Sequence, residues 1–214
     1  MGENRIKLVA ADMDGTLLNR ERKITKYTQN VIKKAMAQGV YFVPATGRAV
    51  NALPPELKEM EGIRYGIFSN GATIYDLKEE KVIYKNHFEM DRVLELMDFL
   101  KQFDLKESIS LNGQSYANKK EMENIDYYEL DSNTKAIVQG SRVLVDDLEM
   151  FVKEQSTTVE KTTLLFKTME ERRRAADALS KIEDIQFSSS LPRILRFLRK
   201  AVIKEMVCSI LQRS

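Results

Sequence analysis

Two aspartates one residue apart are the part of this sequence best suited to chemistry. Asp12 and Asp14 follow residues 6–11, which are apolar except for Lys7, and Gly15 comes directly after the pair. Carboxylates this close repel one another unless a cation or a proton intervenes, and Mg²⁺ is a cation that prefers oxygen ligands. With such an ion bound, Asp12 could attack as a nucleophile while Asp14 holds a proton for the leaving group. The pair therefore predicts a magnesium site that carries a nucleophile and an acid.

A second polar stretch, residues 45–48, follows another apolar run. Its Thr46 offers a hydroxyl and its Gly47 an unobstructed backbone amide, and both suit phosphate oxygens at the start of a helix. Each stretch also has a simpler interpretation. An Asp-Gly pair can merely form a turn, and Thr-Gly-Arg can be a helix cap followed by a salt bridge. The functional interpretation is favoured because the two stretches follow consecutive predicted strands.

The elements around these stretches form a crossover unit. Residues 6–11 are almost continuously apolar, which predicts a strand buried on both faces of a parallel sheet. Thr25 can cap a following helix, Gly39 can end it, and residues 40–45 form a second buried strand. Ligands of such sheets bind at the carboxyl ends of the strands. We therefore expect both polar stretches to face one crevice.

The rest of the chain predicts a second, inserted domain. Asn70 with Gly71, and later Asn112 with Gly113, predict two-residue hairpin turns. Hairpins then alternate with amphipathic helices, including a helix over 169–182 and a strand over 162–166. The predicted fold is α/β, with a core over 1–80, an α+β insert over 81–186, and an atypical, truncated return to the core over 187–214.

Composition excludes several classes of function. The chain has 214 residues, with 34 Lys and Arg against 32 Asp and Glu, so its net charge of +2 gives no reason to expect a nucleic-acid or membrane partner. No apolar run is long enough to span a membrane and no basic, apolar leader is present, which predicts a cytoplasmic protein. Cys208 is the only cysteine of the chain, so an internal disulfide cannot form. His87 is the only histidine and has no second histidine or cysteine cluster to join, so a soft-metal site or a Ser-His triad would lack residues that it needs.

Three motifs carry a family resemblance: "DMDGT" at residues 12–16, "ATGR" at 45–48 and "SNGA" at 69–72. In this order they resemble the haloacid dehalogenase superfamily, in particular its Cof-type phosphatase branch. The resemblance implies a Rossmann-like core with an inserted cap, Mg²⁺ as cofactor, and hydrolysis of small phosphomonoesters through an aspartyl-phosphate. Sugar, nucleotide and cofactor phosphates all remain open as substrates, as does the oligomeric state.

The resemblance also implies roles for single residues. Asp12 would be the nucleophile and a metal ligand. Asp14 would be the general acid and then the base, with its backbone carbonyl on the metal. Thr46 would bind the phosphate, with Gly15 and Gly47 beside it. Independently of the resemblance, Asn70 could be a further phosphate contact, although a turn alone is enough to explain an asparagine there.

The C-terminal part departs from the family pattern. The family's lysine and its late acidic stretch of the form GDxxND are missing in their usual form. If suitable codons encode residues 193–197, reading them from the third base returns the Asn-Leu-Glu-Ile that the family has there. We hypothesise a frame-shifted, truncated chain in which residues 193–214 do not pack against the sheet, and in which Lys200 or Lys204 lies near the family's lysine. The alternative function is then a catalytically impaired phosphate-binding protein.

Overall fold

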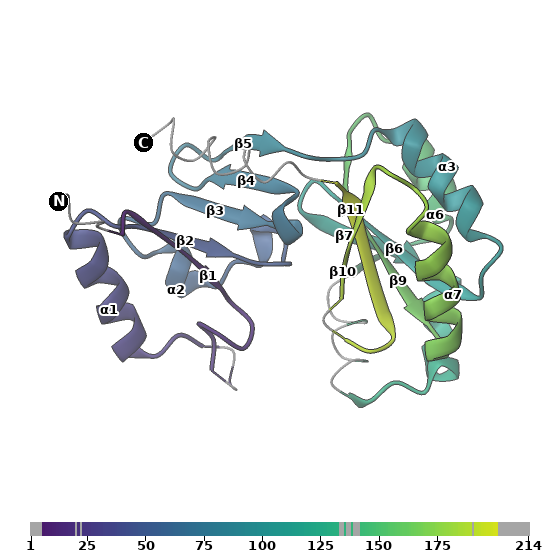
Figure 1. Ribbon diagram of the computed structural model, residues 1–214, viewed down its shortest axis with the longest axis horizontal. Coiled ribbons are helices and arrows are strands. Elements are labelled where there is room, and N and C mark those ends of the chain that lie inside the picture. Colours follow the sequence, from purple (N-terminus) through teal and green to yellow (C-terminus); the bar gives the residue numbers. More distant parts are fainter. Residues whose placement is uncertain are drawn as a thin grey trace. The chain divides into compact units, whose positions relative to one another are not determined.

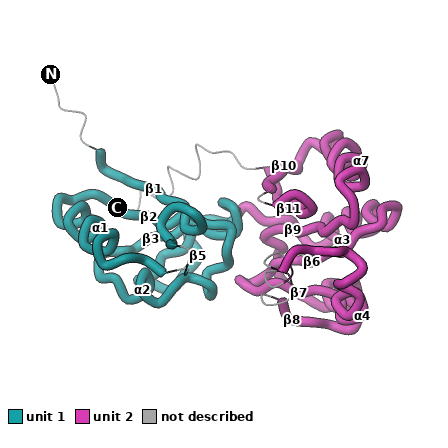
Figure 2. The backbone as a smooth tube through the Cα atoms, turned by 90° about the horizontal axis from the view of Figure 1, so that it is seen from below, with its two compact units in different colours: residues 1–85, 202–214 teal, residues 86–201 magenta. Residues whose placement is uncertain are grey.

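The computed structural model describes residues 6–19, 21, 23–132, 135, 138, 142–189 and 191–200. These residues form two compact units that divide after Lys85, each built around its own β-sheet (Figure 2). Helices accompany both sheets, so the predicted α/β class is confirmed. No helix in the described ranges combines the length and the apolar composition needed to cross a membrane.

The first unit holds a five-stranded mixed sheet in simple sequential order (Figure 1). Its strands are β1 (Leu8–Asp12), β2 (Tyr41–Ala45), β3 (Tyr65–Phe68), β4 (Thr73–Asp76) and β5 (Lys81–Lys85). The first three strands run parallel, and the last two pairings are antiparallel. The predicted crossover is confirmed, because α1 (Lys26–Ala37) joins β1 to its parallel neighbour β2.

Local capping explains where α1 begins and ends. The hydroxyl of Thr25 accepts a hydrogen bond from the backbone N–H of Thr28 at 3.2 Å, as an N-cap residue does. After the helix, Gly39 adopts a φ of +81° and its N–H donates to the carbonyl of Met36 at 2.9 Å. A residue with a Cβ would be strained in that left-handed conformation, so both predicted helix signals are confirmed.

The burial predicted for the first strand is wrong. In the described part of the chain, β1 is the outer strand of its sheet and pairs with β2 alone. Val9 is 38% exposed, and Ile6, which precedes the strand, is 70% exposed. An apolar run shows that a segment can be buried on both faces, but the neighbours that would cover it are a tertiary property.

The second unit holds a six-stranded sheet in the order β10-β11-β9-β6-β7-β8, in which β7 and β8 are parallel and the other pairs antiparallel. The strands are β6 (Leu105–Leu111), β7 (Gln114–Asn118), β8 (Arg142–Val145), β9 (Val159–Phe166), β10 (Ile185–Ser188) and β11 (Ile194–Arg199). The helices are α3 (Met90–Leu100), α4 (Lys119–Glu123), α6 (Leu148–Lys153) and α7 (Met169–Leu179). Apolar side chains of α3, α6 and α7 pack on one face of this sheet (Figure 1).

The two units divide at positions that differ from the predicted boundaries. The first unit extends to Lys85 rather than residue 80, because β5 pairs with β4. Residues 187–200, predicted to return to the core, include β11, which lies between β10 and β9 in the second sheet. Neither pairing can be read from local sequence, since both depend on which strand edges are available.

The first residues of the tail, which were predicted not to pack against the core sheet, pack in the sheet of the second unit instead. Four side chains of β11 are buried: Ile194, Leu195, Phe197 and Leu198. The ring of Phe197 makes an edge contact with Phe88 at a centroid separation of 6.1 Å. Residues 201–214, including Lys204 and Cys208, lie outside the described residues. Lys200 is exposed after β11, and its N–H donates to the carbonyl of Asp184 at 2.8 Å.

Replacing Phe197 with alanine should test the packing of β11. Phe197 is 1% exposed and belongs to the core between the second sheet and its helices. Truncating such a side chain removes buried apolar area and leaves a cavity, which costs ~3–5 kcal/mol. We expect this loss in urea denaturation, with little change for the exposed Arg199→Ala. Equal, small effects of the two variants would show that β11 does not contribute to the core.

Steric overlap explains why β3 contains a glycine, Gly66. A Cβ at Gly66 would overlap the ring of Phe68, with the ring Cζ at 2.6 Å, and Phe68 is fully buried. Gly66→Ala should therefore destabilise the first unit by ~1–3 kcal/mol, the usual cost of overpacking a core. The thermal midpoint of Gly66→Ala, compared with that of Gly15→Ala, checks this. Gly15 has open space around its Cβ position, so its replacement reports backbone strain without overlap.

Candidate active site

The first component of the site is the turn at the end of β1. Asp12 and Asp14 are both exposed, while Met13 between them is completely buried. The N–H of Met13 donates to the Oδ1 of Asp12 at 2.8 Å, which fixes the orientation of that carboxylate. Gly15 then turns the chain with a φ of +81°, a conformation that favours glycine. The two carboxylates thus face solvent from the carboxyl end of a strand.

The second component is the loop after β2. Asp12 and Ala45 are direct partners across the parallel pair, so Thr46 follows at the same edge of the sheet. Thr46 is only 5% exposed, and its hydroxyl accepts a hydrogen bond from the N–H of Arg48 at 3.1 Å. Its own N–H donates to the carbonyl of Ile67 in β3 at 2.9 Å. Thr46 is thus held between its own loop and the neighbouring strand.

A charged pair joins these two components. The Nε of Arg48 donates to the Oδ2 of Asp14 at 2.9 Å, and its Nη2 donates to the Oδ1 at 2.6 Å. This two-point geometry is the strongest form of a carboxylate–guanidinium contact. This contact shows that the two stretches lie together at one edge of the sheet, and a crevice that both of them line stays a prediction. Sequence reasoning noted a salt bridge from Arg48 but gave it no partner, because the two residues are 34 positions apart.

The third component is the loop between β3 and β4. The N–H of Ser69 donates to the carbonyl of Arg48 at 2.9 Å, and the N–H of Asn70 donates to the carbonyl of Thr46 at 3.1 Å. A Cβ on Gly47 would lie 3.0 Å from the Oδ1 of Asn70. Glycine at position 47 therefore permits the amide of Asn70 to lie against the loop backbone. Hydrogen bonds and packing thus hold the second and third loops together.

The predicted two-residue turn at Asn70 and Gly71 is wrong in length. Phe68 pairs with Thr73, which leaves four residues in the loop, and Asn70 has a φ of +61°. The hairpin itself is present. The N–H groups of Ser69 and Asn70 bond to the loop after β2, and the N–H of Ala72 donates to the carbonyl of Ser69 at 3.3 Å. At Asn112 and Gly113 the two-residue turn is confirmed, because Leu111 pairs with Gln114.

The segment after Thr46 also differs from the helix that was predicted to begin there. The segment after Arg48 forms only a 3₁₀ turn, η1 (Val50–Ala52), and then the short helix α2 (Pro55–Lys58). Leu53 is extended, with a ψ of 130°, because the residue before a proline avoids the helical region. The site is therefore built from loop backbone and not from the end of a long helix.

Asp12 and Asp14 are the candidate ligands for a metal ion. Among the residues that the structure describes, no group of three or more His, Cys, Asp or Glu side chains is placed to hold one. Asp12 and Asp14 provide two exposed carboxylates, and both oxygens of Asp14 are bonded to Arg48. Mg²⁺ commonly binds through one or two protein carboxylates and keeps several waters. The pair fits this ion and would be a poor site for a metal that needs a closed protein cage.

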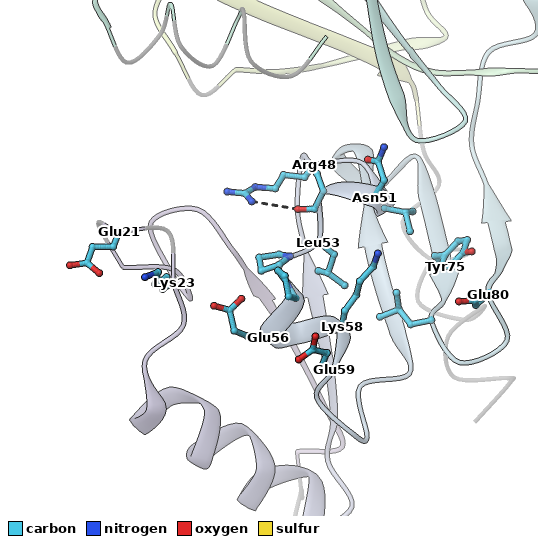
Figure 3. A pocket seen from close by; sticks show the side chains of 15 residues that line it. Glu21, Lys23, Arg48, Asn51, Leu53, Glu56, Lys58, Glu59, Tyr75 and Glu80 are labelled. Carbon is cyan, nitrogen blue, oxygen red and sulfur yellow. Dashed lines mark hydrogen bonds between the residues drawn. The ribbon is translucent and has the colours of Figure 1, made fainter. Parts of the chain in front are cut away.

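A pocket of about 870 Å³ adjoins the site within the first unit (Figure 3). Arg48 lines it, and the Nη1 of Arg48 donates to the carbonyl of Ala52 at 3.5 Å. In the described part of the chain its lining includes neither Asp12 nor Asp14. Arg48 is therefore the link between the pocket and the paired carboxylates.

The sequence is similar to that of known proteins. The pattern of the haloacid dehalogenase-like hydrolase family matches residues 9–212. A protein of Buchnera aphidicola subsp. Schizaphis graminum is 38% identical over 121 residues, which are 55% of this chain and 43% of that protein. The 5-amino-6-(5-phospho-D-ribitylamino)uracil phosphatase YcsE of Bacillus subtilis is 37% identical over 89 residues, 40% of this chain and 36% of that protein.

The fold is also similar to that of a solved structure. A haloacid dehalogenase-like hydrolase from Bacillus subtilis superposes with a TM-score of 0.77 at 19% identity, over 97% of this chain and 79% of that one. The chain belongs to the haloacid dehalogenase-like hydrolase family, because the family pattern covers most of its length. The matched regions span less than half of the two relatives named above.

Proposed function

We propose that the protein hydrolyses small phosphomonoesters through an aspartyl-phosphate intermediate, with Mg²⁺ as cofactor. The observation that carries this proposal is the convergence of three loops at one sheet edge around Asp12 and Asp14. Family membership and the phosphatase name of the Bacillus subtilis relative support it. That relative's substrate is a phosphorylated ribityl compound by name, which agrees with a small phosphorylated metabolite as substrate class.

The nucleophile in this proposal is Asp12. One oxygen of its carboxylate attacks phosphorus, a new O–P bond forms, and the bond from phosphorus to the ester oxygen breaks. The leaving alkoxide takes a proton from Asp14, so a neutral alcohol departs. Water then attacks the phosphoryl group on Asp12 and gives a proton to Asp14, which releases inorganic phosphate and restores both residues. Bound Mg²⁺ would offset the negative charge shared by the phosphate and the carboxylates.

Arg48 gives this scheme a specific requirement. Its guanidinium bonds both oxygens of Asp14, and a carboxyl group that donates a proton to a leaving group must have one oxygen available. Arg48 must therefore release one oxygen of Asp14 during turnover. The side chain of Arg48 is 27% exposed and that of Asp14 is 55% exposed, so water can replace the lost bond.

The loops after β2 and β3 are proposed to hold the phosphate. Thr46 supplies a hydroxyl at the sheet edge, and the absence of a side chain at Gly47 leaves the loop backbone open to oxyanions. Asn70 lies against Gly47 and would add an amide N–H from the third loop. Gly15 contributes the turn that presents the two carboxylates and needs no direct contact with the substrate.

The test is hydrolysis of p-nitrophenyl phosphate by the purified chain, with Mg²⁺ and then with excess EDTA. We expect release of inorganic phosphate that depends on Mg²⁺ and returns when the ion is restored. The matched control is Asp98→Asn, which removes a carboxylate whose side chain is 81% exposed on α3 in the second unit. Binding of phosphate without turnover, under all metal conditions, would favour the impaired phosphate-binding protein instead.

A further inference from the structure

The second sheet ends at a strand whose outer edge is open. β8 is last in the strand order and, among the described residues, pairs with β7 alone. Its side chains Val143 and Leu144 point to opposite faces of the sheet, since directions alternate along a strand, and they are 45% and 47% exposed. The strand therefore lacks full cover on either face as well as a partner along its edge.

The sequence of β8 does not protect this edge. An outer strand presents unpaired N–H and C=O groups, and proteins commonly shield them with a proline, a lysine, a bulge or a covering segment. Residues 142–145 include neither proline nor lysine, and their register with β7 is regular. A partner strand would bond the open backbone groups and bury the exposed apolar side chains. β8 therefore has the properties of an edge that pairs with another chain.

Two opposite charges flank the exposed part of β8, and neither is paired with an opposite charge in the described part of the chain. Arg142 begins the strand, and its Nη1 donates to the carbonyl of Val138. Burial and repulsion from Arg196 lower the pKa of Arg142 to about 10, and no described carboxylate opposes this shift. Asp146 directly follows the strand and is exposed. Both charges are thus available to a partner.

The spacing of these charges fits a two-fold pairing of β8 with the β8 of a second copy. In an antiparallel pair, two opposite residues direct their backbone groups either toward each other or both away. Because these directions alternate along a strand, a two-fold pairing sets opposite each other only residues an even number of positions apart. Arg142 and Asp146 are four positions apart. A pairing centred on Leu144 therefore places each Arg142 opposite Asp146 of the other copy.

The other outer strands of the two described sheets do not have this self-complementary charge. Lys7 and Asp12 flank β1, but they are five positions apart and so cannot lie opposite each other. The same pairing of β5 would set Lys81 opposite Lys85, which is repulsive. β10 is preceded by Asp184, whose carboxylate already forms an ion pair within its own chain. The charges therefore distinguish β8 from the remaining edges.

We propose that β8 is an interaction edge through which the protein pairs with a second copy of itself, antiparallel and centred on Leu144. Each copy contributes Arg142 to one ion pair and Asp146 to the other, and Leu144 meets its equivalent on the two-fold axis. This isologous arrangement is closed, because it satisfies both edges at once. The strand is short, so the interface is small and the dimer is weak and concentration-dependent. The interface includes no residue of the candidate active site.

Sedimentation equilibrium of the full chain at increasing concentration tests the dimer. We expect the average mass to rise from 24.7 kDa toward twice that value. In Asp146→Lys each Arg142 faces a lysine, so the dissociation constant should rise by about tenfold or more. The charge control is Asp98→Lys on α3, where the side chain of Asp98 is 81% exposed, and it should dimerise like the parent. A parent chain that stays monomeric, or an Asp146→Lys variant that dimerises equally well, overturns the proposal.

Mixing two variants checks the register. Arg142→Glu alone sets two carboxylates opposite each other, as Asp146→Lys alone sets two cations. One copy of each variant restores both ion pairs, so the mixture should dimerise more strongly than either variant by itself. A mixture that is no more dimeric than its components overturns this register.

A cross-link tests the same register without altering Arg142, which is partly buried. The Cα atoms of opposite residues in an antiparallel pair are about 4.5–5.5 Å apart, within the range that a disulfide spans. With Cys208→Ser as background, Leu144→Cys should form a disulfide-linked dimer under mild oxidation. Met150→Cys is the control, because Met150 is 54% exposed but lies on α6 outside the edge. Equal cross-linking at the two positions overturns the proposal.

Discussion

Replacing Asp12 with asparagine is expected to lower phosphomonoester hydrolysis by about 10⁴-fold or more, the scale of losing a catalytic nucleophile. Asparagine keeps the size and shape of the side chain but removes the negative charge of the proposed nucleophile and proposed metal ligand. Met13 can still donate its N–H to the Oδ1 of the amide, so the local turn should persist. Initial rates at saturating p-nitrophenyl phosphate measure the effect.

A structural readout accompanies this experiment. Because Asp12 is exposed, its replacement should leave the thermal midpoint close to that of the parent chain. Beryllium fluoride, which mimics a phosphoryl group on a carboxylate, should modify the parent at Asp12 and leave Asp12→Asn untouched. Hydrolysis that survives in Asp12→Asn at the parent rate would exclude a covalent intermediate at this position.

Replacing Asp14 with asparagine should have a smaller effect that depends on the leaving group. A general acid contributes ~10² to 10⁴ in rate, and most when the leaving alkoxide is a strong base. Turnover of an alkyl phosphate should therefore fall further than turnover of p-nitrophenyl phosphate, whose leaving group needs little protonation. Comparing the ratio of the two rates in the parent and in Asp14→Asn measures this.

The effect of Asp14→Asn on catalysis can be separated from its effect on folding, because the ion pair between Asp14 and Arg48 contributes little to stability. Both side chains are partly exposed, at 27% and 55%, so losing the ion pair should cost at most ~1 kcal/mol of stability. Urea denaturation of Asp14→Asn should confirm that the fold is retained. Equal rate losses for the alkyl and aryl phosphates would assign Asp14 a role other than proton donation.

Several elements were predictable because their causes are local. The cap at Thr25, the left-handed Gly39 and the tight turn at Asn112 and Gly113 follow from which conformations a residue tolerates within a few positions. The same is true of the strand–helix–strand unit, because the spacing of its apolar residues can be read within each contiguous segment. These signals do not depend on what the rest of the chain does.

The errors arose where a segment's neighbours decide its environment. Residues 6–11 have the composition of a central strand, yet β1 is the outer strand among the described residues. The segment from Ile194 to Arg199 was not expected to pack, because its sequence departs from the family pattern. It nevertheless forms β11, which pairs with a strand on each side and buries Phe197. Hydrophobic side chains specify that burial is favourable, and available strand edges specify where it occurs.

For the candidate site, the sequence by itself determined which residues follow the strands, and from these it predicted the groups that are proposed to react. Asp12, Asp14 and Thr46 follow strands, and the carboxyl ends of parallel strands share one edge of a sheet. Only the tertiary structure decided that Arg48 takes both oxygens of Asp14 and that Asn70 lies against Gly47. It also decided that β8 pairs with β7 and is an outer strand among the described residues. These contacts join residues far apart in the chain, and strand register and side-chain direction, which local sequence does not encode, bring them together.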